Sequence, residues 1–210
     1  MATIKDGIHG AFSGKVGKIV GYVRKGQAII RTQGERTTPP TPKELLNREK
    51  FAISQKWLSP LIDFLRIGFK DYRPTYEGFL AAKSYNQKNA MICDENNNFS
   101  IDPALALVSF GSQKLPLTAK ALTNNNQEII FNWSTEGVYE YNDQAMVLAY
   151  DIENAKVIYN AGISKRQTGT ATLKLAITDI KKTFHVYIAF ISDNRTSKSN
   201  SIYLGSLQII

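Results

Sequence analysis

Side chains that commonly act as nucleophiles, bases or metal ligands are few in this sequence of 210 residues. The two histidines, His9 and His185, are 176 positions apart, and neither lies near the single cysteine, Cys93. A catalytic triad needs a nucleophile, a base and an orienting acid at fixed distances, and a structural zinc site needs four ligands. The sequence therefore predicts no catalytic residue, no metal site and no cofactor.

A glycine-rich segment near the N-terminus partly matches a phosphate-binding loop. Between Gly10 and Gly14 there are three residues, and Val16 follows Lys15. A Walker-type loop needs four residues between its glycines, and a Ser or Thr after the lysine to bind magnesium. Nucleotide binding is therefore not expected. The acidic pair Asp94-Glu95 lies in a polar, Asn-rich stretch and is interpreted as a solvated turn.

Basic residues are concentrated in the first half of the chain. Residues 1–90 hold 16 Lys and Arg against 7 Asp and Glu, a balance of +9, whereas residues 91–210 hold 10 against 11. Such asymmetry favours a polyanionic partner or an acidic protein surface. A flexible cationic segment suits phosphate contacts, although a solvated or interface hairpin is the more common reason for such a segment. The candidate anion- or nucleic-acid-binding residues are Lys15, Lys18, Arg24, Lys25, Arg31 and Arg36.

Two β-rich runs in this basic region predict a hairpin. The runs Lys18–Arg24 and Gln27–Arg31 flank a Lys25-Gly26 turn, and a glycine-rich arm precedes them. An isolated two-stranded hairpin is marginal in water. We therefore expect it to pack on the following helices or on another chain. The candidate assembly-interface residues are Phe12, Ile19, Tyr22 and Ile29.

Helices are expected after a proline-rich joint at residues 32–42. Thr41 is a suitable N-cap, and Glu44 three residues later completes a capping box. The dipeptide Ser59-Pro60 predicts a restart or kink with Ser59 as a second N-cap, and Gly68 a stop. A third helix is predicted from Thr75 through Asn86.

From Ala104 onward the pattern changes to short runs that alternate with period two. Strands at this spacing, separated by turn residues, are typical of a β-sandwich. With the polar stretch Asp94–Asn98 as the boundary, we expect an α+β fold: residues 1–98 form the arm, hairpin and short helices, and residues 99–210 an all-β sandwich. The predicted strands are Leu105–Phe110, Leu117–Leu122, Glu128–Trp133, Ala145–Tyr150, Lys156–Asn160, Thr170–Leu175, Phe184–Ser192 and Ser201–Ile209.

Two resemblances add to these patterns. An early strand that ends in Trp133 and a late strand, Phe184–Phe190, resemble those of fibronectin type III or immunoglobulin-like modules. Such modules usually bind partners or act as spacers, and rarely catalyse reactions. The N-terminal motif GxxGxFSGKVGxxVG, at residues 7–21, resembles the opening of an uncharacterised family of the Bacteroidota and their mobile elements. One departure from this family is Arg24-Lys25, where a Trp-Lys pair is expected. Further matches lie at residues 48–51, 58–61, 68–70, 81–86, 187–192 and 199–205.

These observations favour a non-enzymatic structural or assembly protein, such as a component of a phage-derived or other multi-copy particle. The alternative is a nucleic-acid-associated protein without sequence preference, and a third is an enzyme whose site forms on folding or across subunits. No signal peptide or run of about 18 apolar residues is evident. We therefore expect protein partners or a homo-oligomer, no membrane, no small-molecule substrate, and a cytoplasmic or particle-associated location.

Overall fold

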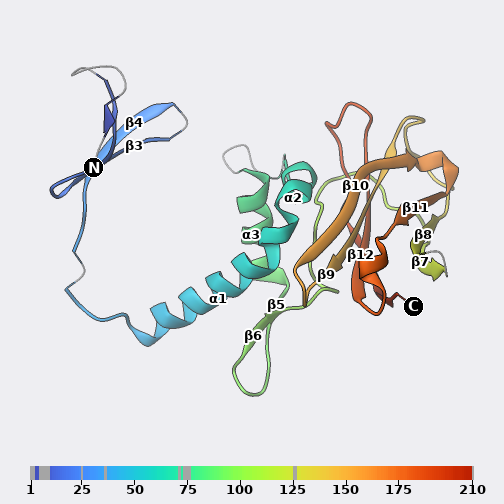
Figure 1. Cartoon of the computed structure of the whole chain (residues 1–210). Helices are drawn as coiled ribbons and strands as arrows, with labels where there is room; N and C mark the ends of the chain where they lie inside the picture. Colours follow the sequence, from blue (N-terminus) through green and yellow to red (C-terminus); the bar gives the residue numbers. More distant parts are fainter. Residues whose placement is uncertain are drawn as a thin grey trace. The chain divides into compact units, whose positions relative to one another are not determined.

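The computed structural model describes residues 3–4, 10–24, 26–35, 37–70, 72, 77–124 and 127–209. The chain divides into two compact units, Met1–Glu44 and Leu45–Ile210. We call them the N-terminal unit and the main unit, and Figure 1 shows the elements of each. The division differs from the predicted boundary near residue 98, because the helices share a core with the strands that follow them.

The N-terminal unit is a four-stranded antiparallel sheet. Its strands are β1 (Thr3–Ile4), β2 (Phe12–Val16), β3 (Ile19–Arg24) and β4 (Gln27–Thr32), in that spatial order. Strands β3 and β4 confirm the predicted hairpin almost residue for residue. Strand β2 comes from the glycine-rich arm and was not predicted, because glycine is a poor strand former. The turn between β2 and β3 uses Gly17 at φ +58°, a conformation that favours glycine.

Three helices follow the N-terminal sheet: α1 (Pro42–Leu58), α2 (Ile62–Gly68) and α3 (Gly78–Asn89), with the short η2 (Ser59–Leu61) between the first two. All but the first three residues of α1 belong to the main unit. The predicted capping box is confirmed, since the Glu44 amide donates to Thr41 Oγ1 at 3.3 Å and the Thr41 amide to Glu44 Oε2 at 2.8 Å. Ser59 was predicted to be an N-cap, and this prediction is wrong. Its hydroxyl donates instead to the Gln55 carbonyl, back into α1.

Two larger antiparallel sheets make up most of the rest of the main unit. One has the order β10-β9-β12-β13 and the other β11-β8-β7. Most predicted strands are found with boundaries shifted by a few residues. The observed bounds are β7 Ala119–Asn124, β8 Glu128–Trp133, β9 Gln144–Asp151, β10 Lys156–Lys165, β11 Thr170–Lys174, β12 Thr183–Ile191 and β13 Ile202–Gln208.

The four-stranded sheet is covered on both faces. On β9, Met146, Leu148 and Tyr150 pack into a cluster with the helices. Ala145, Val147 and Ala149, which alternate with them, pack into a second cluster with the three-stranded sheet. The main unit therefore has three layers, with helices, the four-stranded sheet and the three-stranded sheet stacked in turn (Figure 1).

Buried tyrosines also attach the four-stranded sheet to α1 and to the turn that follows β6 (Phe99–Ile101). The Tyr150 hydroxyl donates to the Trp57 carbonyl of α1 at 2.9 Å, and the Tyr187 hydroxyl donates to the Pro103 carbonyl at 2.7 Å. Burial raises the pKa of Tyr150 to about 12, so its hydroxyl remains a donor at physiological pH.

One strand prediction for residues 91–110 is wrong. The segment Leu105–Phe110 is irregular, although Ala106 and Val108 are buried and produce the alternation that suggested a strand. The predicted turn at Asp94–Asn98 is found, and it joins the two strands of a small hairpin, β5 (Met91–Cys93) and β6 (Phe99–Ile101). The fold as a whole is mostly β, with antiparallel sheets and a helical layer.

Candidate interaction surface

The N-terminal sheet has two faces of opposite chemistry. Directly paired residues of an antiparallel sheet share a face, and successive residues of one strand alternate between faces. Val16 pairs with Ile19, and Gly21 pairs with Ile30. Alternation then places one set of nonpolar side chains together, which we call the apolar face. It consists of Phe12, Val16, Ile19, Val23, Ala28 and Ile30.

This apolar face is exposed. The exposed fractions are 57% for Val16, 44% for Ile19, 56% for Val23 and 66% for Ile30. Among the described residues of the N-terminal unit, only Gly21 is buried. Within the described residues of this unit, the nonpolar side of the sheet therefore has no buried hydrophobic cluster against it, whereas a stable sheet normally buries such a side against a second layer.

Gly21 is buried because the Phe12 ring lies over it. A Cβ atom at position 21 would be 2.5 Å from the Phe12 carbonyl oxygen and 2.6 Å from a ring carbon. Only glycine permits this approach without a shift of Phe12. The glycine in the middle of β3 therefore flattens the centre of the apolar face and fixes the position of its largest side chain.

The opposite side of the sheet carries basic residues, and we call it the basic face. Alternation places Lys15, Arg24 and Arg31 there. The Arg31 guanidinium lies 5.7 Å from the centroid of the Tyr22 ring, a cation–π arrangement across β3 and β4. The nonpolar residues of this face are Val20, Tyr22 and Ile29.

The predicted interaction residues are thus divided by the pleat of the sheet. Phe12 and Ile19 lie on the apolar face, but Tyr22 and Ile29 lie on the basic face beside the cations. The sequence spacing could have shown this, because residues an odd number of positions apart on one strand, such as Ile19 and Tyr22, lie on opposite faces.

The predicted cations are also only partly brought together. Lys15, Arg24 and Arg31 share one face, whereas Lys18 lies in the turn after β2. The Lys18 ammonium is 4.0 Å from the Glu35 carboxylate, and both side chains are more than three-quarters exposed, so the pair contributes little. Lys25 and Arg36 lie outside the described residues.

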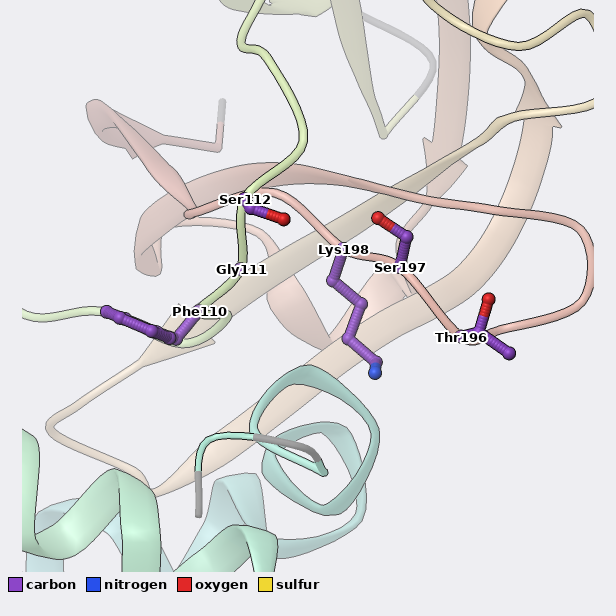
Figure 2. Close-up of a pocket in the computed structure, with 6 residues that line it drawn as sticks. All are labelled: Phe110, Gly111, Ser112, Thr196, Ser197 and Lys198. Atoms are coloured by element: carbon purple, nitrogen blue, oxygen red, sulfur yellow. The ribbon is translucent and has the colours of Figure 1, made fainter. Parts of the chain in front are cut away.

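The main unit has a cavity of about 370 Å³ where two segments distant in sequence run side by side. Figure 2 shows Phe110–Ser112 against Thr196–Lys198, with the Lys198 side chain extending between those of Phe110 and Thr196. A Cβ atom at Gly111 would be 2.0 Å from the Lys198 carbonyl oxygen, so the backbones meet at a glycine. No pattern in the sequence indicated this contact.

Other candidate reactive residues include Asp94, His185 and Cys93, and the first two make hydrogen bonds within the fold. The Asp94 carboxylate accepts hydrogen bonds from the Asn98 side chain and from the amides of Asn98 and Asn96, which lower its pKa. This confirms the predicted turn. His185 is half-buried on β12, with Nδ1 2.9 Å from the Tyr203 hydroxyl, and burial lowers the pKa of its ring. Cys93 is exposed.

Metal-ligand clusters and membrane helices are not found in the part of the chain that the structure describes. Within that part, no group of three or more His, Cys, Asp and Glu side chains is arranged to hold a metal ion. The helices described there are also too short or too polar to cross a bilayer.

By its fold, this is a mostly β protein, built of a small sheet with unlike faces and a larger three-layered unit. The chain belongs to the Family of unknown function (DUF6266), whose profile matches residues 11–205. The match agrees with the resemblance to an uncharacterised family noted from the sequence. Comparison with curated proteins and with solved structures gives no match.

Proposed function

We propose that this protein is a non-enzymatic assembly protein whose copies associate through the apolar face of the N-terminal sheet. The observation that supports it is the exposure of Val16, Ile19, Val23 and Ile30 together on one side of a sheet. Contiguous exposed nonpolar patches on a protein surface commonly mark interaction sites.

The energetic argument is that the N-terminal unit needs another layer. Units of about 40 residues seldom bury enough nonpolar surface to be stable without disulfides, metals or oligomerisation. Full burial of one Val or Ile side chain contributes about 1.5–3 kcal/mol. Covering the four exposed residues is therefore a substantial driving force for association.

A second copy of the chain is the occupant that suits this face. Two identical apolar faces can pack across a two-fold axis, as the inner faces of a β-sandwich do. In that arrangement both basic faces point outward, so Lys15, Arg24 and Arg31 of the two copies do not meet. Edge strand β4 offers a further contact by strand addition, which would extend pairs of copies into larger assemblies.

In this proposal the main unit is a spacer or display module of the immunoglobulin or fibronectin type III kind. Strands β7, β8 and β11 correspond to strands A, B and E of such a sandwich, and β9, β10, β12 and β13 to strands C, C′, F and G. Both orders agree with the observed sheets. A component of a phage-derived or other multi-copy particle, in the cytoplasm or within the particle, would use the two units in this way.

The experiment is sedimentation velocity of the full chain over a wide concentration range. We expect a self-associating species, and we expect the double variant Val23→Ser, Ile30→Ser to shift it toward monomer. The control is Leu122→Ser in β7, which removes an equally exposed nonpolar side chain of the main unit. A wild-type chain that stays monomeric at the highest concentration would refute the proposal, as would equal association of both variants.

A second candidate function, sequence-nonspecific nucleic-acid binding, is supported by the basic face. Three cations and an aromatic ring on one sheet suit phosphate contact with base stacking. The two functions use opposite faces, so the Val23→Ser, Ile30→Ser variant separates them. It should lose association while retaining the nucleic-acid contacts made by each copy.

A further inference from the structure

A second cavity of the main unit surrounds a buried arginine. It has a volume of about 430 Å³ and is independent of the N-terminal sheet. Arg166 contributes to its wall from η3 (Arg166–Thr168), together with Lys114, Tyr139, Glu140 and Asp143. The loop that follows β12 supplies hydroxyl and amide side chains, among them Ser192 and Asn194.

Arg166 is held rigidly. Its guanidinium carbon lies 4.4 Å from the centroid of the Phe190 ring and 4.7 Å from that of Tyr139. Its amide donates to the Asp143 carbonyl at 2.6 Å, and its carbonyl accepts from Trp133 Nε1 at 2.7 Å. Only 2% of the residue is exposed. A planar fork fixed in this way is preorganised for a ligand.

The guanidinium lacks an ionic or hydrogen-bonding partner among the residues that the structure describes. Its Nε is buried and has no acceptor. Arg166 is among the residues that line the cavity, so its side chain is within reach of a ligand there. A buried cation without hydrogen bonds is costly. Burial lowers the pKa of Arg166, but an arginine stays charged at neutral pH.

The nearby acid does not neutralise Arg166 by direct contact. The Asp143 carboxylate accepts from Gln113 Nε2 at 3.3 Å and from the Glu140 amide at 3.2 Å. Each of its oxygens accepts one of these bonds, and its charge acts on the Arg166 guanidinium through space, without a hydrogen bond between the two side chains among the described residues. Its role is to hold the loop before β9, which leaves the arginine fork for another acceptor.

From this geometry we propose that the cavity around Arg166 binds a small molecule through a carboxylate group. A carboxylate matches the two parallel donors of a guanidinium in shape and charge. Exposed Lys114 adds a second cation at the wall. The acids Glu140 and Asp143 repel a dianionic phosphate more strongly than a monoanion. A volume of this size is within the range of small-molecule sites.

The test is an amide NMR titration of the full-length protein with acetate, acetamide and inorganic phosphate. Acetamide has the shape of acetate without its charge, so it isolates the contribution of the carboxylate. We expect acetate to shift the amides of Tyr139, Gly169 and the 192–197 loop saturably, with a dissociation constant on the order of 1 mM for so small a ligand. Acetamide and phosphate should bind at least about tenfold more weakly.

The variant Arg166→Lys keeps the charge and loses the fork, and it should weaken acetate binding about tenfold. If this variant does not fold, Lys114→Ala still tests the site, with an expected loss of about two- to threefold. The control Lys165→Ala removes an exposed neighbouring cation and should leave binding unchanged. Equal shifts with acetate and acetamide, stronger binding of phosphate, or a cavity that responds to none of them would overturn the proposal.

Discussion

The N-terminal sheet and the four-stranded sheet of the main unit have similar strand patterns, but they differ in what covers them. Strands β9 and β12 are buried on both faces, between the helices and the second sheet. Strands β2, β3 and β4 carry nonpolar residues that stay exposed. The alternation of a sequence thus predicts a strand but not the layer that covers it, and the uncovered sheet is where association is expected.

The largest expected effect is the loss of a buried aromatic ring in the main unit. Phe190→Ala should lower the free energy of unfolding by about 3–5 kcal/mol, because it opens a cavity between the two sheets. Phe12→Ala on the apolar face should change it by less than about 1 kcal/mol. Urea unfolding is followed by tryptophan fluorescence for the main unit, where Trp57 and Trp133 lie, and by far-UV circular dichroism for both units. Equal effects would remove the contrast between the sheets.

A smaller effect is expected at a buried ion pair. The Asp179 carboxylate has no exposed surface and accepts from Lys156, from Lys182 at 3.3 Å and from the Ala176 amide. Burial alone would raise the pKa of Asp179, but these hydrogen bonds outweigh it and lower the pKa. Asp179→Asn should destabilise the protein by about 2–3 kcal/mol.

The pH dependence of this pair follows from the direction of the shift. A lowered folded-state pKa means that the stabilisation is complete above the ordinary Asp pKa of about 4, and is lost as the pH falls through the folded-state value. The difference between wild type and Asp179→Asn should therefore vanish in acid. The exposed Lys18–Glu35 pair gives the control, because Glu35→Gln should change stability by less than about 0.5 kcal/mol at any pH.

The next effect concerns the centre of the apolar face. Gly21→Ala would drive a Cβ into Phe12, and the displaced ring should weaken self-association about fivefold to tenfold, or about 1–1.4 kcal/mol. Sedimentation velocity measures it. Gly34→Ala is the matched control, since an added Cβ there meets nothing within 4 Å. If both variants associate like wild type, the apolar face is not the contact.

The smallest effect is expected on the basic face. Arg31→Gln should weaken binding to DNA of any sequence and reduce the slope of log affinity against log salt by about 1. Fluorescence anisotropy at several salt concentrations measures the slope. Lys174→Gln, an exposed cation of the main unit, should leave it unchanged. The same slope for all three proteins would exclude phosphate contacts through Arg31.

Much of the secondary structure followed from the sequence where local signals were strong. The capping box at Thr41 and the strand Glu128–Trp133 were predicted to the residue. The segment Leu105–Phe110 was wrongly predicted as a strand because its buried residues alternate as in a strand. Its backbone amides, however, do not pair with a neighbouring strand in the part of the chain that the structure describes. There, the Val108 amide donates to Ser201 Oγ and the Phe110 amide to the Gly68 carbonyl. Such long-range bonds leave no periodic trace.

The candidate surfaces were predictable to different degrees. The charge and nonpolar content of the N-terminal unit drew attention to this segment, but the division of its residues between two faces emerged only from the strand register. The environment of Arg166 had no sequence signal at all. Its contacts with Tyr139, Asp143 and Phe190 join three segments that are far apart along the chain.

The three-layered arrangement has a consequence for biosynthesis. Helices α1, α2 and α3 leave the ribosome early, yet the strands they cover, β9 and β12, end only at Asp151 and Ile191. About 100 further residues must therefore be translated before the helices can pack on this sheet, which takes about 5–20 s at about 5–20 residues per second. During that interval the sheet against which Leu58, Phe64 and Leu65 pack has not formed. These side chains are then exposed, and we expect the nascent chain to bind chaperones that recognise hydrophobic segments.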